Sequence, residues 1–223
     1  METNHLSVAN FFICFSDFLK IGCISELISF TDKLAQMKRT EALKAALLQN
    51  YSVADTDISL KYRLTEKDLV FIQDTAKEVL RNMPPKAFNC TQISAIWAAM
   101  IEDHSEIPVA VICGDLHFTD KKIFVCKEPL PGPEQGSVID GDWDGHCWLE
   151  FGGLIGDASF FRTVYFGEVP YQFKDLVVEK FGKGKGTIIA TPEQMLHNEL
   201  IYIPKYSLSA TQINGLINGI PGS

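Results

Sequence analysis

Residues 145–150 read Gly-His-Cys-Trp-Leu-Glu, and Asp157 follows in the next apolar run. Upstream, the sequence Asn89-Cys90-Thr91 opens a segment with helical character. A cysteine at a helix start, a histidine on a strand and an aspartate on the following strand are the residues that a thiol nucleophile needs. The positive end of the helix and the imidazole favour the thiolate, and the carboxylate fixes the tautomer and orientation of the imidazole. The prediction of both fold and chemistry therefore begins here.

Cys90 is the candidate nucleophile. Asn89 is a favourable N-cap residue, so the thiol of Cys90 is expected at the positive end of the helix dipole. That position lowers the pKa of a thiol and supplies backbone N–H groups where an oxyanion could form. The alternative is a structural cysteine buried in the first helical turn, and position alone does not decide between the two.

His146 and Asp157 are predicted to meet across a β-hairpin. In an antiparallel hairpin the residue numbers of every two paired positions add up to the same total. A tight turn near residues 151–152 therefore pairs Trp148 with Ile155 and His146 with Asp157. Side chains at paired positions have Cβ atoms about 4.5–5.5 Å apart, within hydrogen-bonding range for imidazole and carboxylate. The alternatives are a surface pair without function and a register shifted by one residue, which would send one side chain to the other face.

The composition is that of an ordinary globular chain. Its 223 residues suit one domain, or one domain with a helical N-terminal addition, and 46% of them are hydrophobic and 22% charged. The net charge is −8, whereas a nucleic-acid surface requires a basic footprint, so no nucleic-acid partner is expected. An acidic chain favours basic partners or simply remains soluble.

The cysteines are predicted to be free thiols. Four of the six lie inside apolar runs, where free cysteine behaves as a small hydrophobic residue. Because no Cys-x-x-Cys pair is present, no structural zinc site is expected, and no cofactor is expected either. The pattern indicates a reducing, cytoplasmic compartment. The cysteines are Cys14, Cys23, Cys90, Cys113, Cys126 and Cys147.

Residues 8–30 form an apolar N-terminal segment. Glu2 and His5 precede it where a secretory signal would carry basic residues, so such a signal is not expected. Charged residues at positions 17, 20 and 26 interrupt it too often for a membrane span, so no membrane partner is expected. Its apolar residues recur at near-helical spacing, which predicts a buried amphipathic helix, with a docking helix for a partner as the alternative.

Helix-forming segments dominate the first half of the chain. Residues 40–48 are rich in strong helix formers behind a threonine cap. Thr65 opens a second helix that Pro84-Pro85 ends, and residues 90–103 form a third. The sequence therefore predicts helices before any strand.

Short β-branched runs dominate the second half, and residues 119–121 between two of them indicate a hairpin. Helices first and an antiparallel sheet afterwards predict an α+β fold. We expect a helical N-terminal region over residues 1–83 and a core over residues 84–223, forming one compact unit. The predicted strands are 108–113, 123–126, 147–151, 158–166, 187–190 and 200–203, and the later helices are 172–181 and 192–198.

The order of these motifs resembles the transglutaminase-like branch of the papain-like cysteine protease superfamily. That family's pattern reads cysteine, a helix, a short "IPA-V" strand, then His-x-Trp-x-Glu and an aspartate. Here Asn89-Cys90 opens the helix, and the run Ile107-Pro108-Val109-Ala110-Val111 follows it. The His146 motif and Asp157 come next. The resemblance covers residues 88–166, about a third of the chain.

By this resemblance Cys90 is the nucleophile, His146 the base and Asp157 the orienting residue, on a papain-like or transglutaminase-like core. Members of the superfamily include proteases, transglutaminases, peptide-amide hydrolases, bacterial deamidase effectors and inactive proteins. The active members transfer an acyl group to the cysteine. The chain departs from the family pattern where Asn89 replaces the usual glycine before the cysteine, and in the short segment between His146 and Asp157.

Residues 140–145, Asp-Gly-Asp-Trp-Asp-Gly, match the beginning of a calcium-binding loop. The bidentate glutamate of such a loop would fall at Phe151, whereas Glu150 is one position short, and a strand follows in place of a helix. We therefore expect an acidic, solvated loop beside the active cleft and no metal site, with calcium binding by this loop as the alternative. Trp143 is expected either to line that cleft near His146 or to pack on the sheet.

The sequence predicts a cytoplasmic, thiol-dependent enzyme that acts on a protein or peptide substrate at a peptide bond or carboxamide. Cys90 would attack the carbonyl, His146 would protonate the departing amine, and water or a second amine would resolve the thioester. Protease, amidase or deamidase, and transglutaminase outcomes all remain open. The alternative is a catalytically inactive member whose sheet serves as a protein-interaction module.

Overall fold

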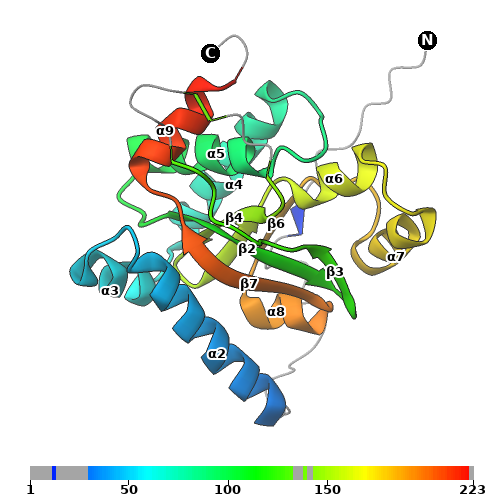
Figure 1. The fold of residues 1–223 in the computed structure, drawn as a ribbon, viewed down its shortest axis with the longest axis horizontal. Helices are drawn as coiled ribbons and strands as arrows, with labels where there is room; N and C mark the ends of the chain where they lie inside the picture. The colour runs from blue at the N-terminus through cyan, green and yellow to red at the C-terminus, as the bar shows by residue number, and fades with distance from the viewer. Residues whose placement is uncertain (1–11, 14–29, 133–137, 140–142, 221–223) are drawn as a thin grey trace.

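Helices cover both faces of one sheet in this α+β fold (Figure 1). The computed structural model describes residues 12–13, 30–132, 138–139 and 143–220. Within these ranges the strands are β1 (Phe12–Ile13), β2 (Ala110–Phe118), β3 (Lys121–Phe124), β4 (His146–Phe151), β5 (Leu154–Asp157), β6 (Thr187–Ala190) and β7 (Leu200–Ser207). They follow the order β1-β6-β5-β4-β2-β3, with β7 also paired to β2. Every pairing is antiparallel except that of β1 with β6.

Strand β2 lies between β7 on one edge and both β4 and β3 on the other. Its residues 110–114 pair with β4 and its residues 116–118 pair with β3. Ile112 has Trp148 of β4 and Ser207 of β7 as its two partners, so β4 and β7 lie on opposite edges of β2. The topology thus places the strand that carries His146 one strand away from β7.

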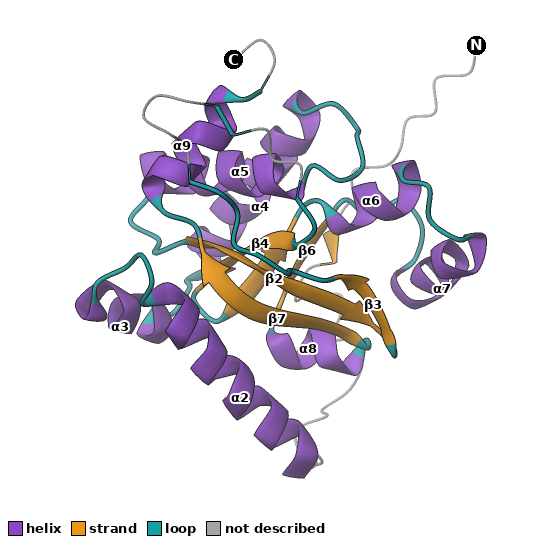
Figure 2. Ribbon diagram, in the orientation of Figure 1, coloured by secondary structure: helices purple, strands orange, loops and turns teal. Residues whose placement is uncertain are grey.

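The helices form two layers, one on each face of the sheet (Figure 2). Helices α4, α5 and α9 cover one face, and α2, α6, α7 and α8 cover the other. Their bounds are α2 (Phe30–Leu47), α4 (Glu66–Asn82), α5 (Cys90–His104), α6 (Phe160–Phe166), α7 (Tyr171–Phe181), α8 (Pro192–His197) and α9 (Ala210–Asn218), and α3 (Val53–Lys61) connects α2 to α4.

Helix α5 is fixed on the sheet by an apolar stripe. Ile93, Trp97 and Ile101 recur every four residues, and all three side chains are fully buried in the same cluster as Leu149 of β4. This spacing aligns them on one face of the helix, which explains why the segment forms a core-facing helix. Burying such a side chain stabilises the fold by about 1.5–3 kcal/mol. The stripe therefore fixes where the first residue of α5 lies relative to β4.

Several predicted elements are confirmed. The helix opened by Thr65 is α4, and a capping box forms between Thr65 and Asp68. The hairpin at residues 119–120 joins β2 and β3. Residues 40–47 of the helix predicted over residues 40–48 belong to α2, which begins at Phe30 and ends at Leu47. Its threonine cap is wrong, because Thr40 lies inside the helix and its hydroxyl donates to Gln36 O at 3.0 Å.

The strand predicted over residues 158–166 is wrong. Strand β5 occupies Leu154–Asp157, and helix α6 begins at Phe160. The Asp157 carboxylate accepts the backbone N–H groups of Ser159 and Phe160, and such bonds start a helical turn. Helices α3 and α9 were not predicted. Of the N-terminal segment predicted to be helical, residues 8–30, residues 12–13 form β1 and Phe30 begins α2. Residues 8–11 and 14–29 lie outside the described ranges.

The register of the β4–β5 hairpin differs from the predicted one by two residues. Leu149 pairs with Gly156 and Glu150 with Ile155 across a turn formed by Gly152-Gly153. Both glycines have positive φ angles, 54° and 83°, as a two-residue hairpin turn of the favoured hand requires. A shift of two residues keeps every side chain on its face. His146 and Asp157 therefore share a face as diagonal neighbours.

The turn glycines provide a matched test of what holds this hairpin. Gly152→Ala should lower the free energy of unfolding more than Gly153→Ala. Both substitutions place an alanine at positive φ, at a cost of about 1–2 kcal/mol, but a Cβ at Gly152 would also lie 2.5 Å from Leu64 Cγ. A Cβ at Gly153 meets nothing within 4 Å. Urea unfolding of the two variants measures the difference, and equal losses would contradict this account.

Candidate active site

Cys90 is the first residue of α5, as predicted, and only 6% of its surface is exposed. Asn89 occupies the N-cap position, but its side chain forms no capping hydrogen bond, and its Oδ1 is buried without a partner. The predicted N-cap position of Asn89 is therefore confirmed, although its side chain does not cap the helix. The helix begins instead with the bond from the backbone N–H of Ile93 to Asn89 O, at 3.0 Å. The Cys90 Sγ atom lies 3.9 Å from Gly145 O, at the start of β4.

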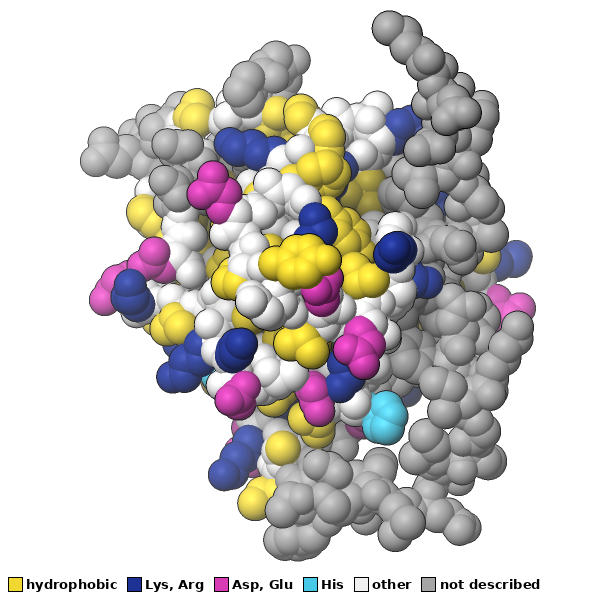
Figure 3. Space-filling model, turned by 90° about the vertical axis from the view of Figure 1, so that its right-hand side faces the viewer, with side chains coloured by type: hydrophobic (Ala, Val, Ile, Leu, Met, Phe, Trp, Pro, Cys, Tyr) yellow, Lys and Arg dark blue, Asp and Glu magenta, His cyan; other side chains and the backbone are white. Residues whose placement is uncertain are grey.

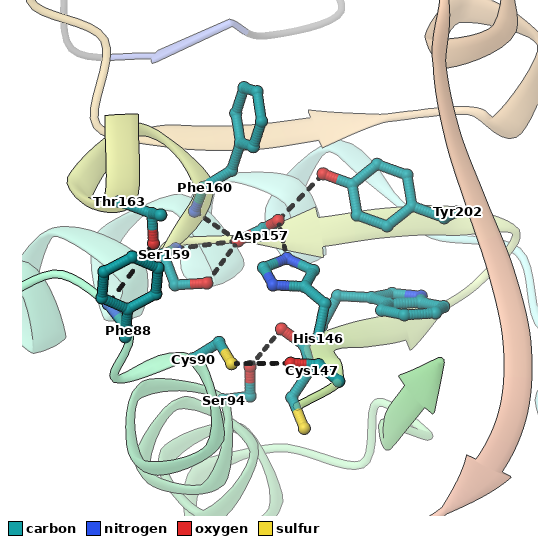
Figure 4. Close-up of polar contacts among 12 residues, drawn as sticks. Phe88, Cys90, Ser94, His146, Cys147, Asp157, Ser159, Phe160, Thr163 and Tyr202 are labelled. Carbon is teal, nitrogen blue, oxygen red and sulfur yellow. Dashed lines mark hydrogen bonds and ion pairs between the residues drawn. The ribbon is translucent and has the colours of Figure 1, made fainter. Parts of the chain in front are cut away.

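His146 and Asp157 form a buried pair. His146 Nε2 lies 2.6 Å from Asp157 Oδ2, and neither side chain has any exposed surface. Figure 4 shows the imidazole between Cys90 and the carboxylate. The other ring nitrogen, Nδ1, is buried and has no hydrogen-bond partner. Because Nε2 is engaged by Asp157, Nδ1 is the nitrogen left for exchange of a proton with the thiol.

Four donors besides His146 hold the Asp157 carboxylate. The backbone N–H and hydroxyl of Ser159 donate to Oδ1 at 2.8 and 2.9 Å, and the N–H of Phe160 donates at 2.9 Å. The hydroxyl of Tyr202, on β7, donates to Oδ2 at 2.9 Å. The aspartate is thus fixed by β5, by the start of α6 and by β7 together.

Tyr202 and Ser159 are the site residues that the sequence did not predict. Ser159 follows Asp157 by two residues, and an Asp-x-Ser-x pattern before an apolar run is a signal for a helix start. Tyr202 lies 45 residues after Asp157, and only the pairing of β2 with both β4 and β7 brings it near. No local pattern carries that information.

Aromatic rings enclose the imidazole. The ring of Phe124, on β3, stacks on His146 with centroids 4.8 Å apart and planes 20° apart, and Trp148 lies at 6.2 Å. Phe88 contacts Phe124 edge-on at 6.3 Å and is 57% exposed. Phe88 also has a φ angle of 58°, which is strained for a bulky residue and common near functional sites. These rings limit water around the imidazole.

The electrostatics favour a thiolate at Cys90. The neighbouring Cys147 thiol, together with the imidazole of His146, holds the pKa of Cys90 well below its usual 9.0, against the opposing effect of burial. Burial lowers the pKa of His146, but the charge and hydrogen bond of Asp157 and the contact with Cys90 outweigh it and raise that pKa to about 10. These two shifts favour a thiolate–imidazolium pair.

Glu150, the other carboxylate on this strand face, has different partners. Its Oε1 accepts the indole N–H of Trp148 at 2.8 Å and pairs with Arg39 of α2. It therefore fixes α2 to β4 and does not orient His146. Two further carboxylates that precede His146 in the sequence, those of Asp140 and Asp142, lie outside the described ranges.

Trp143 lies beside the site through Gly145. Its indole N–H donates to Glu128 O at 2.8 Å, and its ring covers Gly145 so closely that a Cβ there would lie 2.0 Å from the ring atom Cη2. The ring thus packs next to the carbonyl that Cys90 approaches. Within the described ranges no three His, Cys, Asp or Glu side chains form a group that could hold a metal ion. Residues 140–142 of the calcium-like loop lie outside the described ranges, so this finding does not cover them.

The face of the molecule seen from the right of Figure 1 carries side chains of both charges. In Figure 3 hydrophobic side chains gather near the middle of this face, and lysine or arginine and acidic side chains alternate around them. The described side chains on this face form no continuous basic stripe of the kind that nucleic-acid binding requires. Among the described residues, no helix is both long enough and apolar enough to cross a membrane.

Comparison of the chain with models of known families, with curated proteins and with solved structures gives no match. The site must therefore be interpreted from its own geometry.

Thiol alkylation tests the electrostatics directly. Iodoacetamide should label Cys90 at about pH 6, where an ordinary thiol is almost fully protonated. Cys126 is the internal control, because burial raises its pKa to about 12. His146→Ala should move labelling of Cys90 to higher pH, since the thiolate loses its ion pair. Peptide mass spectrometry reads each site, and indistinguishable pH profiles for the two cysteines would refute a thiolate at Cys90.

Proposed function

We propose that this chain is a thiol-dependent acyl-transfer enzyme that acts on a peptide bond or carboxamide of a protein or peptide. The observation that carries the proposal is the buried His146–Asp157 pair with a free Nδ1 next to Cys90. A nucleophile, a base and an orienting group in this relation are what nucleophilic catalysis by a thiol requires.

Cys90 attacks the substrate carbonyl as the thiolate. The first backbone N–H groups of α5 have no carbonyl partner within the helix, so they can donate to the oxyanion that forms beside Sγ. Removing one such donor typically costs about 10²–10³-fold in rate. No metal or cofactor takes part in this step as proposed.

His146 acts through Nδ1. As the imidazolium it gives its Nδ1 proton to the departing amine, and Cys90 then carries the acyl group as a thioester. Water or a second amine, deprotonated by the neutral imidazole, attacks the thioester and releases the thiolate. Asp157 holds Nε2–H throughout and stabilises the positive charge on the ring.

The order of the motifs supports membership of the transglutaminase-like branch of the papain-like cysteine superfamily. The motifs follow one another in the family's order. Cys90 begins α5, the end of the Ile107–Val111 run lies in β2, His146 begins β4 and Asp157 ends β5. Free cysteines at positions 90, 113, 126 and 147 support a reducing compartment, and we propose the cytoplasm.

A non-enzymatic interaction module is the second candidate. The observation in its favour is that Cys90 is 6% exposed and His146 fully buried, so a substrate cannot reach Sγ without displacing a neighbouring group. Low-pH alkylation of Cys90 separates the two candidates, since an interaction module does not need an accessible thiolate.

The reaction itself is tested on a complex substrate mixture. The purified protein and its Cys90→Ala variant are incubated with a proteome, and peptides are searched for new termini, deamidated glutamine and new crosslinks. Products present with the wild type and lost with Cys90→Ala support the proposal and identify the outcome. Products that persist with the variant, or the absence of products with alkylatable Cys90, would count against acyl transfer.

Asp157→Asn tests the orienting role. An amide at this position can place its NH₂ toward Nε2, which favours the tautomer with a proton on Nδ1 and removes the base. Turnover of the identified substrate should fall by roughly 10³–10⁴-fold. Tyr202→Phe removes one donor to the same oxygen and leaves the charge, so its loss should be much smaller. Circular dichroism checks the fold of both variants, and near-normal turnover by Asp157→Asn would refute the role.

The pH dependence follows from the pKa of His146. Because that pKa is raised to about 10, the imidazolium persists as pH rises and is lost only near that value. The rate should therefore stay high through neutral pH and fall as pH passes about 10. The acid limb should lie well below the usual thiol pKa, where Cys90 becomes protonated. A rate profile that falls between pH 6 and 8, as for a free imidazole of pKa about 6.5, would contradict the assignment.

A further inference from the structure

Cys113 and Cys147 face each other on neighbouring strands. They are directly paired residues of β2 and β4, both are fully buried, and their Sγ atoms lie 2.9 Å apart. Paired residues of antiparallel strands have Cα atoms about 4.5–5.5 Å apart, which is within the range that a disulfide spans. Both are free thiols. The strands can therefore accept a bond between these sulfur atoms with little movement.

Cys147 also contacts Cys90. The two thiols are close enough that Cys147 lowers the pKa of Cys90. Cys90 Sγ lies 3.9 Å from Gly145 O, and the Ser94 hydroxyl donates to Cys147 O at 3.1 Å, which fixes the first turn of α5 on β4. Figure 4 shows Cys90 and Cys147 at this contact between helix and strand. The three sulfur atoms thus form a row that begins at the candidate nucleophile, continues at Cys147 and ends at Cys113.

We propose that Cys147 and Cys113 form a thiol relay that returns Cys90 to its reduced state after oxidation by a peroxide. The proposal rests on the function proposed above, since it takes Cys90 to be an accessible thiolate. A thiolate that a peptide can reach is also open to hydrogen peroxide, and low-pKa thiolates are the cysteines that peroxides oxidise.

The chemistry balances in three steps. The Cys90 thiolate attacks one peroxide oxygen, forming Cys90 sulfenic acid and releasing hydroxide. The Cys147 sulfur displaces the hydroxyl of the sulfenic acid, its proton leaves with that hydroxyl as water, and a Cys90–Cys147 disulfide forms. Cys113 then attacks the Cys147 sulfur, which breaks the first disulfide, forms a Cys113–Cys147 disulfide and frees Cys90. The two electrons that reduce the peroxide come from the Cys113–Cys147 pair.

The direction of the last step follows from the leaving group. In thiol–disulfide exchange the thiol of lower pKa leaves faster, and His146 stabilises the thiolate of Cys90. Attack by Cys113 on Cys147 therefore expels the better leaving group and moves the disulfide away from the site. A small dithiol reductant would then regenerate Cys113 and Cys147.

The relay is tested by treating the full chain with hydrogen peroxide, blocking free thiols by alkylation and mapping disulfides by mass spectrometry. In the wild type we expect a Cys113–Cys147 disulfide while Cys90 stays alkylatable. In Cys113→Ala the disulfide should stop at Cys90–Cys147, with alkylation of Cys90 lost until dithiothreitol is added. In Cys147→Ala, Cys90 should proceed to sulfinic acid, a loss that dithiothreitol does not reverse.

Cys126→Ala is the matched control, because it removes another buried thiol and should behave as the wild type. The relay would be overturned if Cys90 became sulfinic acid as fast in the wild type as in Cys147→Ala. This outcome would count even if the variants fold poorly. Low-pH alkylation of untreated protein keeps the two proposals apart. If Cys90 alkylates at low pH but no Cys113–Cys147 disulfide forms, only the relay fails, and if Cys90 does not alkylate, both fail.

Discussion

The buried carboxylate of Asp157 is the constraint on which the rest of the site depends. It lies at the end of β5, and it receives hydrogen bonds from His146, Ser159, Phe160 and Tyr202. A buried charge without partners would be strongly destabilising, whereas hydrogen bonds to charged groups each contribute about 1.5–3 kcal/mol. The same bonds end β5, begin α6 and tie β7 to the hairpin. The hydrogen bonds of the Asp157 carboxylate therefore determine both the local fold and the orientation of the imidazole.

The ionisable groups of the site lie next to groups of opposite charge inside the core. The lowered pKa of Cys90 and the raised pKa of His146 favour a negative charge on the thiol and a positive charge on the imidazole, which lies between the thiol and the Asp157 carboxylate. Burial raises the pKa of an isolated carboxyl group, yet that of Asp157 is lowered, because His146 and the N–H groups of Ser159 and Phe160 outweigh the effect of burial. Donors that do not titrate at neutral pH thus allow the charged pair to persist in an apolar surrounding.

The sequence predicts those features that depend on local pattern. The helix opened by Thr65, the helix that begins at Cys90 and the face shared by His146 and Asp157 all follow from spacings of a few residues. The hairpin register was wrong by two, because the two turn glycines at positive φ, and not the residues before them, form the turn. Successive side chains of a strand point to opposite faces of the sheet, so an error of two residues leaves His146 and Asp157 on the same face. Tyr202 is different: its place depends on β2 pairing with two strands far apart in the sequence.

The groups that hold the site and the groups that cover it are separate. Asp157 and His146 are held by β4, β5, α6 and β7, elements within the core, whereas the cover comes from Phe124 at the end of β3 and from Trp143 in the segment before β4. Lys121 and Lys122 of β3 are exposed and its other two residues half-buried, whereas β4 is buried throughout. Elements with little buried apolar surface open at lower free energy than core strands do. Phe124 and Trp143 can therefore be displaced without any change in the hydrogen bonds of Asp157. The site can be covered while His146 and Asp157 keep the same relative orientation.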